Sequence, residues 1–394
     1  MLFNSTRFLL FLPVVLVVAA LVPLRLRNRF LLVASYYFYG CWDWRFLGLL
    51  LMTTVVDFNV AKAIAATDDE TRRKRLLLFV ITVNLTALGF FKYYNFFVGS
   101  ALSLMHGIGI QAGAPTLNII LPVGISFYTF QSMAYSIDVY RRQFAPVQNF
   151  FDYALFVAYF PQLVAGPISR PAHLAPQLLA PARLTPERIN TAITLLLIGF
   201  AKKVLIADAI GPEVSRIFDD PTHMSSGILL RGIYLFAFQI YADFSGYSDI
   251  ARGVSELFGI RLVVNFNQPY FSASITEFWR RWHISLMTWL RDYVYIPLGS
   301  NRHGQRQMYR NLFLTMLIGG LWHGANWTFV VWGSLHGAFL AIEPALGVDL
   351  AKAPRQDRSA TQWAVRLIRI VATFHLVTFL FILFRSPDLA TAVQ

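Results

Sequence analysis

Long apolar stretches alternate with short polar ones along almost the whole chain, and this pattern predicts membrane helices. A helix that spans a bilayer needs about 20 mostly apolar residues. The stretches that approach this length are 8–24, 46–66, 76–98, 118–137, 189–210, 228–247, 311–331 and 363–384. Two shorter apolar runs, 30–42 and 150–168, are expected to be half-spans or re-entrant pieces. We therefore expect an all-α polytopic membrane protein with roughly nine to eleven membrane helices, in a single domain over residues 1–394.

Two segments between these stretches are predicted to be irregular. Segment 166–186 is rich in proline and cannot form one continuous helix, because proline lacks a backbone donor and clashes with the preceding turn. Segment 265–270, with the sequence NFNQPY, precedes a predicted helix over 274–299. In that helix, Ser274 and Glu277 match the capping-box pattern.

The predicted helix over 274–299 has an aromatic face and a basic face. Its apolar stripe consists of Phe278, Trp282, Leu286, Trp289 and Tyr293. Arg280 and Arg281 face elsewhere, which favours a helix at the membrane–water interface over a full span. These arginines either anchor the helix at lipid headgroups or clamp a phosphate-bearing donor molecule.

Composition and charge agree with a membrane protein. The chain is 56% hydrophobic and only 14% charged, with a net charge of +13. Its basic residues gather between the apolar stretches, as at 25–29, 72–75, 141–142 and 302–310. This is the positive-inside pattern, so we expect these loops on the cytoplasmic side and no nucleic-acid partner. The weakly basic start lacks a clear cleavage site, so the first stretch is expected to be a retained helix.

The sequence contains no pattern typical of a metal site. Cys41 is the single cysteine, which excludes an intrachain disulfide framework and a multi-cysteine metal site. Asp243 and Asp249 differ by about 240° on a regular helix, so they do not form a paired-carboxylate site. Each aspartate either orients a histidine or packs against a buried arginine.

His323 lies in a glycine-bounded apolar run, where an ionisable residue is a functional hypothesis by default. Gly320 and Gly324 are four residues apart and allow another backbone or a ligand to approach closely. Asn326 is expected on the same helix side, where it would fix the tautomer of His323 or hold a substrate carbonyl. Taken alone, these residues fit a structural histidine as well as a catalytic one.

Two further histidines need an explanation. His336 lies thirteen residues after His323, about 220° around a straight helix, so the two point apart unless the helix breaks at Gly324. We expect His336 to be structural, beside Gly333 and Gly337. His283 is expected to share a helix face with Trp279, four residues earlier.

Several motifs together resemble the membrane-bound O-acyltransferases, and best the bacterial branch that handles polysaccharide O-acetylation. They occur in order between residues 89 and 337: GFFKYYNFF, LPVGISFYTFQSMAYSIDVYR, YFPQLVAGPISR, GFAKKVLIAD, YADFSGYSDIARG, NFNQPY, FWRRWHISLMTWLRDYVYIPLGSNR and GGLWHGANWTFVVWGSLHG. The resemblance implies a helical bundle around a tunnel that reaches the cytoplasmic side. It also implies an essential histidine, matched by His323 in WHG, and a second polar residue some forty positions earlier, matched by His283 in RWH. Family members usually continue beyond the last apolar stretch with further helices, whereas this chain stops at Gln394.

The resemblance further implies acyl transfer from a cytoplasmic thioester, such as acetyl-CoA, to hydroxyls beyond the inner membrane of a bacterium. Expected partners are membrane lipid, the thioester donor at the cytoplasmic face and separate periplasmic acetyltransferase subunits, with no permanently bound cofactor. His323 would act as general base, while Trp322 or Asn326 would hold the thioester carbonyl. Alternatives are acyl transfer to peptidoglycan or teichoic acid and, from another class, a transporter or flippase.

Overall fold

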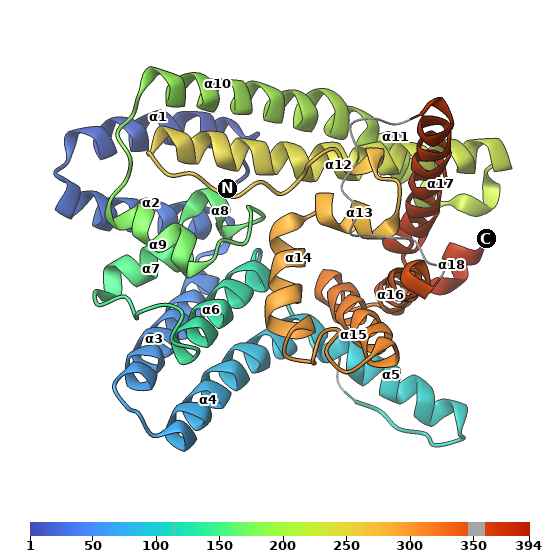
Figure 1. Cartoon of the computed structure of the whole chain (residues 1–394), viewed down its shortest axis with the longest axis horizontal. Helices are drawn as coiled ribbons and strands as arrows, with labels where there is room; N and C mark the ends of the chain where they lie inside the picture. The colour runs from blue at the N-terminus through green and yellow to red at the C-terminus, as the bar shows by residue number, and fades with distance from the viewer. Residues whose placement is uncertain (115, 346–358) are drawn as a thin grey trace. The chain divides into compact units, whose positions relative to one another are not determined.

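The computed structural model describes residues 1–114, 116–345 and 359–394, and the regular elements in these ranges are all helical (Figure 1). The packing of the chain divides it into two compact units. The first unit comprises Met1–Phe200 with Tyr247–Val263, and the second comprises Ala201–Gly246 with Val264–Gln394. The long helix α12 (Ser226–Leu257) contributes residues to both units.

The first unit is built mainly from ten helices. Their bounds are α1 Thr6–Leu21, α2 Leu24–Asp43, α3 Arg45–Ala65, α4 Glu70–Leu88, α5 Tyr94–Gly107, α6 Ile125–Tyr140, α7 Phe150–Ala158, α8 Phe160–Leu163, α9 Pro171–Leu179 and α10 Pro186–Phe200. A π-helical turn, η1 (Gly89–Tyr93), joins α4 to α5. Helices α3, α4 and α6 pack against one another and lie side by side in Figure 1. Because their facing sides are apolar and aromatic, they bury a continuous hydrophobic core.

Two buried polar side chains link helices of the first unit. Asp57 on α3 is fully buried and accepts a hydrogen bond from the Asn84 amide of α4 at 2.7 Å. Arg73, from the basic run at 72–75, is also buried, and its guanidinium donates to the Tyr140 carbonyl oxygen. Part of that basic run therefore joins helices of the unit instead of only marking a side of the membrane.

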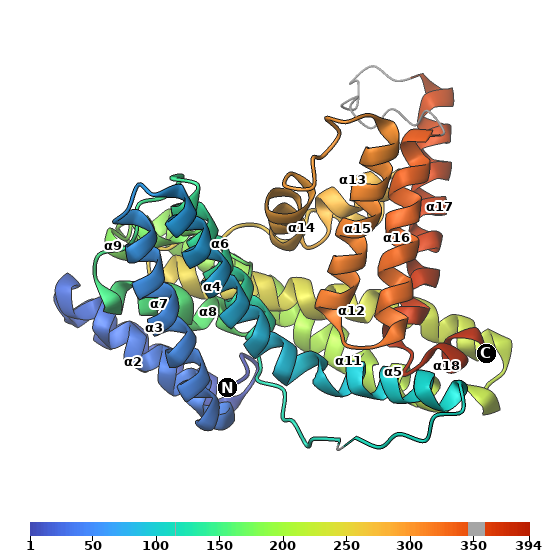
Figure 2. The ribbon, with the colours of Figure 1, turned by 90° about the horizontal axis from the view of Figure 1, so that it is seen from below.

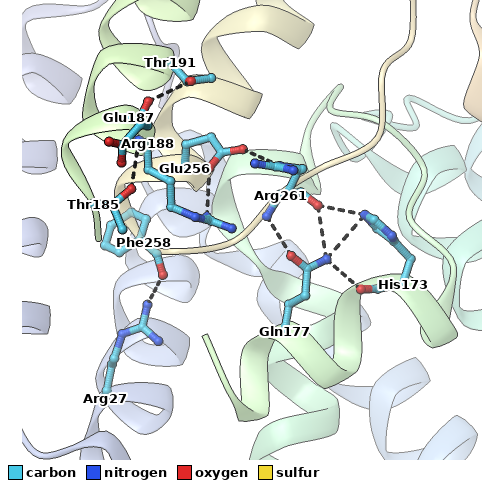
Figure 3. A network of polar contacts seen from close by, with 10 residues as sticks. All are labelled: Arg27, His173, Gln177, Thr185, Glu187, Arg188, Thr191, Glu256, Phe258 and Arg261. Carbon is cyan, nitrogen blue, oxygen red and sulfur yellow. Dashed lines mark hydrogen bonds and ion pairs between the residues drawn. The ribbon is translucent and has the colours of Figure 1, made fainter. Parts of the chain in front are cut away.

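A polar network holds the segment that follows α12 against α9 and α10 (Figure 3). The Glu256 carboxylate forms ion pairs with the Arg188 guanidinium at 2.8 Å and the Arg261 guanidinium at 3.0 Å. Gln177 of α9 accepts from the Arg261 backbone N–H at 2.8 Å, and Arg27 donates to the Phe258 carbonyl oxygen at 2.6 Å. The two arginines compensate the negative charge of this buried glutamate.

The second unit contains the remaining helices. Their bounds are η2 Ala201–Ala207, α11 Asp208–Asp219, η3 Pro221–His223, the first part of α12, η4 Pro269–Phe271, α13 Ile275–Arg281, α14 Ile284–Leu290, η5 Arg291–Tyr295, α15 Gln305–His323, α16 Trp327–Ala345, α17 Ala360–Arg385 and α18 Leu389–Val393. Figure 2 shows α15 and α16 side by side as a helical hairpin, with α17 next to α16.

Four helical stretches among the described residues are long and apolar enough to cross a membrane: Arg45–Ala65, Glu70–Gly107, Ser226–Leu257 and Ala360–Arg385. Segment 166–186 is not one continuous helix, as predicted, although its middle forms the helix α9 (Pro171–Leu179). Segment 265–270 is irregular as far as Gln268, before the 3-10 turn η4. Two of the predicted apolar stretches differ from the structure. The stretch 118–137 becomes helical only at Ile125, and 311–331 is two helices, because α15 ends at His323.

Candidate active site

His283 lies at a sharp break between α13 and α14. Its backbone is left-handed, with φ at 46°, a conformation that costs free energy for a residue other than glycine. Asn265 stabilises the break because its backbone and side-chain oxygens both accept hydrogen bonds from the start of α14. Its carbonyl accepts from the Ile284 N–H at 3.0 Å, and its side-chain oxygen accepts from the Ser285 N–H at 3.1 Å. The single helix predicted over 274–299 is therefore wrong, because bonds from a distant segment replace those of a continuous helix.

Ser274 caps the N-terminus of α13 as predicted, while the returning bond of Glu277 goes to the residue before the cap. The Ser274 hydroxyl accepts from the Glu277 N–H at 3.0 Å, and the Glu277 carboxylate accepts from the Ala273 N–H at 2.9 Å. Arg281 and Arg366 also donate to Glu277, at 2.7 and 3.0 Å. Burial raises the pKa of Glu277, but these hydrogen bonds outweigh it and lower the pKa below its ordinary value.

His323 is the last residue of α15 and lies among aromatic rings. Its imidazole centre is 5.0 Å from that of Trp322, 5.2 Å from Trp332 on α16 and 5.1 Å from Phe384 on α17. Three different helices thus contribute to its surroundings. The ring is half-buried, so it is the less enclosed of the two histidines expected to act together.

His283 lies next to His323, with 6.3 Å between their ring centres. It is fully buried, and its ring also contacts Phe244 at 4.6 Å and Trp322 at 5.6 Å. Burial holds the pKa of His283 well below its ordinary value, and the neighbouring His323 lowers this pKa further. The folded protein therefore keeps His283 neutral at pH 7, as an imidazole that can both donate and accept hydrogen bonds.

Small residues bring α15 and α16 together, as the glycine spacing predicts. A Cβ added to Gly320 would lie 3.0 Å from the Gly333 Cα and still closer to the Phe329 carbonyl oxygen. Gly324, just beyond His323, is extended and lies against the Phe329 ring. Gly320 and Gly324 therefore face the second helix of the hairpin, so a ligand does not occupy the space beside them.

His336 and His323 face the same side of the hairpin, because the helix breaks at Gly324 and turns back. Both rings contact Trp332, at 4.7 Å for His336 and 5.2 Å for His323. His336 is fully buried, and its Nδ1 accepts a hydrogen bond from Trp279 Nε1 at 3.3 Å. The expectation that Trp279 and His283 share a helix face is wrong, since α13 ends between them.

The other expected site residues lie apart from the two histidines or are bonded elsewhere. Asn326 donates to the Pro387 carbonyl oxygen at 2.6 Å and accepts from the Thr328 N–H, because it lies in the turn that starts α16. Asp243 pairs with Lys203 at 2.6 Å instead of with a histidine or an arginine. Arg280 is exposed, while Arg281 pairs with Glu277. Among the expected substrate-binding residues, Trp322 contacts both His283 and His323.

Sequence reasoning missed several residues that build this site. Phe384 on α17 lies 61 positions after His323, and no motif connects the two. Glu343 stands out in the sequence as an ionisable residue seven positions after His336, but nothing there predicts that its carboxylate accepts from the Ile275 and Thr276 N–H groups. Asn265 lies in a segment that proline marks as irregular, which was a usable hint. Across the described ranges, no three His, Cys, Asp or Glu side chains gather as metal ligands.

Comparison with known proteins gives the family that the sequence motifs resemble. The family described as MBOAT, membrane-bound O-acyltransferase family, matches residues 142–385, which include the whole site. The probable alginate O-acetylase AlgI of Azotobacter vinelandii is 46% identical over 396 residues, covering 100% of this chain and 76% of the relative. A peptidoglycan O-acetyltransferase of Helicobacter pylori is 35% identical over 427 residues, covering 100% of this chain and 79% of the relative.

A more distant relative is the teichoic acid D-alanyltransferase of Streptococcus thermophilus. It is 28% identical over 298 residues, covering 68% of this chain and 70% of the relative. These relatives all carry acyl-transfer names, which agrees with a multi-pass membrane enzyme instead of a transporter. The chain belongs to the membrane-bound O-acyltransferase family.

Proposed function

We propose that this O-acyltransferase takes an acetyl group from a cytoplasmic thioester, acetyl-CoA or another acyl thioester, and passes it toward hydroxyls of an exported polysaccharide such as alginate. The single observation that carries the assignment of roles is the neighbourhood of His283 and His323, whose ring centres are 6.3 Å apart with Trp322 against both. The names of the relatives with 46% identity support the choice of acetyl and alginate.

His323 is the general base in this proposal. An alcohol attacks a thioester poorly while it keeps its proton, and a positioned neutral imidazole that removes this proton contributes about 10²–10⁴-fold. The hydroxyl oxygen of the acceptor, which belongs to a periplasmic acetyltransferase subunit, then bonds to the thioester carbonyl carbon. The carbon–sulfur bond breaks, and the proton from the hydroxyl leaves with the thiol. His283, buried and neutral, positions the substrate beside His323.

The surrounding residues have supporting roles. Trp322 lines the site next to both histidines, and Arg280 and Arg281 bind the anionic part of the donor at the cytoplasmic face. Trp279, Asn326 and Asp243 act at a distance by holding the helices that carry the site. No permanent cofactor takes part.

The proposal includes the position of the protein in the membrane and its partners. The shorter helices complete a bundle of roughly nine to eleven membrane helices around a tunnel. The bundle lies in the inner membrane of a bacterium, with the basic loops in the cytoplasm. Periplasmic acetyltransferase subunits receive the acetyl group and complete the transfer to polysaccharide.

A second acceptor is favoured by one comparison. The peptidoglycan O-acetyltransferase of Helicobacter pylori matches 100% of this chain, so cell-wall glycan is the runner-up acceptor. D-alanyl transfer to teichoic acid ranks below it, because that relative matches 68% of the chain. Vesicles supplied with either alginate or peptidoglycan, together with labelled acetyl-CoA, separate these acceptors.

The proposal is tested at His323. His323→Ala and His323→Gln should abolish transfer of labelled acetyl from acetyl-CoA in vesicles that contain the protein and its partner subunits. Both variants should still insert in the membrane and elute as wild type after extraction in detergent. Purified His323→Gln that keeps most of the wild-type turnover would show that another group is the base.

A further inference from the structure

Helix α13 is fastened to α16 at two points by side chains that reach from α16. Near the end of α16, the Glu343 carboxylate accepts from the N–H groups of Ile275 and Thr276, at 2.5 and 3.0 Å. Two helical turns earlier, His336 Nδ1 accepts from Trp279 Nε1. The two bonds are spaced along both helices, so they fix the position and the rotation of α13 on α16.

The bond between Trp279 and His336 requires one form of the histidine. An indole N–H only donates, so Nδ1 of His336 must carry no proton, and the single proton of the neutral ring sits on Nε2. Both side chains are buried, at 4% and 0% exposure, which keeps competing water away. The pair therefore holds His336 in one tautomer and one ring orientation.

Trp332 lies between this bonded pair and the proposed base. Its ring centre is 5.6 Å from Trp279, 4.7 Å from His336 and 5.2 Å from His323, with steeply tilted planes at all three contacts. Trp332 is itself 1% exposed. Aromatic rings in a close-packed interior have few alternative arrangements, so the ring of Trp332 is determined by its neighbours on one side and limits His323 on the other.

We propose that His336 is a positioning residue for His323, acting through Trp279 and Trp332. The inference rests on the proposed function, in which His323 is the general base. It adds that the orientation of this base is set by a second histidine that itself touches no substrate. A displacement of about 1 Å at a reacting group can cost about 10²-fold in rate, so a small movement of Trp332 is enough to matter.

The experiment compares three variants of the full chain in vesicles with its partner subunits, using labelled acetyl-CoA as the probe. His336→Leu removes the acceptor but fills a similar volume, His336→Asn keeps an acceptor oxygen, and Trp279→Phe removes the donor but keeps a ring. We expect His336→Leu to lower turnover per folded molecule about 10-fold or more, with the KM for acetyl-CoA nearly unchanged. His336→Asn should recover a clear part of the lost turnover.

A double mutant identifies the bond as the cause. Because Trp279→Phe and His336→Leu break the same hydrogen bond, the double variant should lose no more turnover than the worse single variant. Phe58→Leu on α3 is the control, since Phe58 is buried in the core of the first unit, where it packs on Phe150 and Tyr153. It should lower thermal stability and leave turnover per folded molecule unchanged.

The outcomes separate this inference from the proposed function. If His336→Leu is less stable but has wild-type turnover per folded molecule, while His323→Gln is inactive, His336 is only structural and the base assignment stands. If the double variant shows fully additive losses, the bond does not act as a unit and the inference is overturned. If His323→Gln is active, the base assignment fails, and this inference fails with it.

Discussion

The imidazole rings of His283 and His323 lie with 6.3 Å between their centres, although the residues are forty positions apart in the chain. They reach this arrangement because the chain breaks at both residues. His283 occupies the left-handed turn between α13 and α14, and His323 is the last residue before the turn between α15 and α16. Each imidazole is thereby placed at a helix end.

The backbone of His283 predicts which substitutions the protein tolerates. Asparagine adopts the left-handed region more readily than most residues, whereas a β-branched residue is strained there by about 1–2 kcal/mol. We expect His283→Asn to unfold at a higher temperature than His283→Val. Thermal unfolding of the two purified variants in the same detergent measures this difference.

Activity should separate the same two variants from wild type. If His283 positions the substrate, both should lower kcat/KM for acetyl-CoA, and by less than His323→Ala does. Full wild-type kcat/KM in His283→Asn would show that the imidazole is not needed. Equal melting temperatures of the two variants would contradict the left-handed backbone.

The free energy of unfolding should depend on pH because the buried His283 resists protonation in the folded protein. Its pKa is lowered in the folded protein, so its stabilising contribution is complete above the unfolded value of about 6.5. Below that pH the unfolded chain binds a proton that the folded chain does not. Stability is therefore lost as the pH falls from about 6.5 toward the folded pKa, by at most about 1.4 kcal/mol per pH unit for this group.

The variant His283→Asn supplies the control for this effect. Removing the imidazole removes its share of the slope, so the unfolding temperature of the variant should fall less steeply than that of wild type between about pH 6.5 and pH 5. Parallel curves for the two proteins over this range would mean that His283 takes up its proton without unfolding.

The contact between Gly320 and Gly333 leaves no room for a methyl group. In Gly320→Ala the new Cβ would meet backbone atoms of Gly333 and Phe329, which cannot move aside as a flexible side chain could. We expect a loss of about 1–3 kcal/mol of stability and a lower turnover, because α15 and α16 carry His323 and Trp332.

The control for this prediction is Gly227→Ala on α12, where a Cβ would meet no atom within 4 Å. Alanine also favours a helix over glycine, so this variant should be at least as stable as wild type. Unfolding temperatures and acetyl transfer per folded molecule are measured side by side. A Gly320→Ala protein with the stability of Gly227→Ala would rule out the close packing of the hairpin.

The sequence by itself determined the features that depend on local composition and spacing. Apolar length predicted most of the helices, proline marked segments 166–186 and 265–270 as irregular, and Ser274 with Glu277 marked the start of α13. Glycine spacing predicted close packing at Gly320. The motifs from residue 89 to 337 together pointed to the family.

Only the tertiary structure decided which side chains meet. The chain breaks at His283 because Asn265, eighteen positions earlier, supplies the hydrogen bonds that a continuous helix would otherwise make. The turn after His323 brings Trp332 and His336 to the same side, which a straight-helix calculation excludes. The partner of Asp243 is likewise distant in the sequence: it is Lys203, forty positions earlier. Such contacts depend on the free energy of packing whole helices together, and no local pattern records which distant residue will supply the partner.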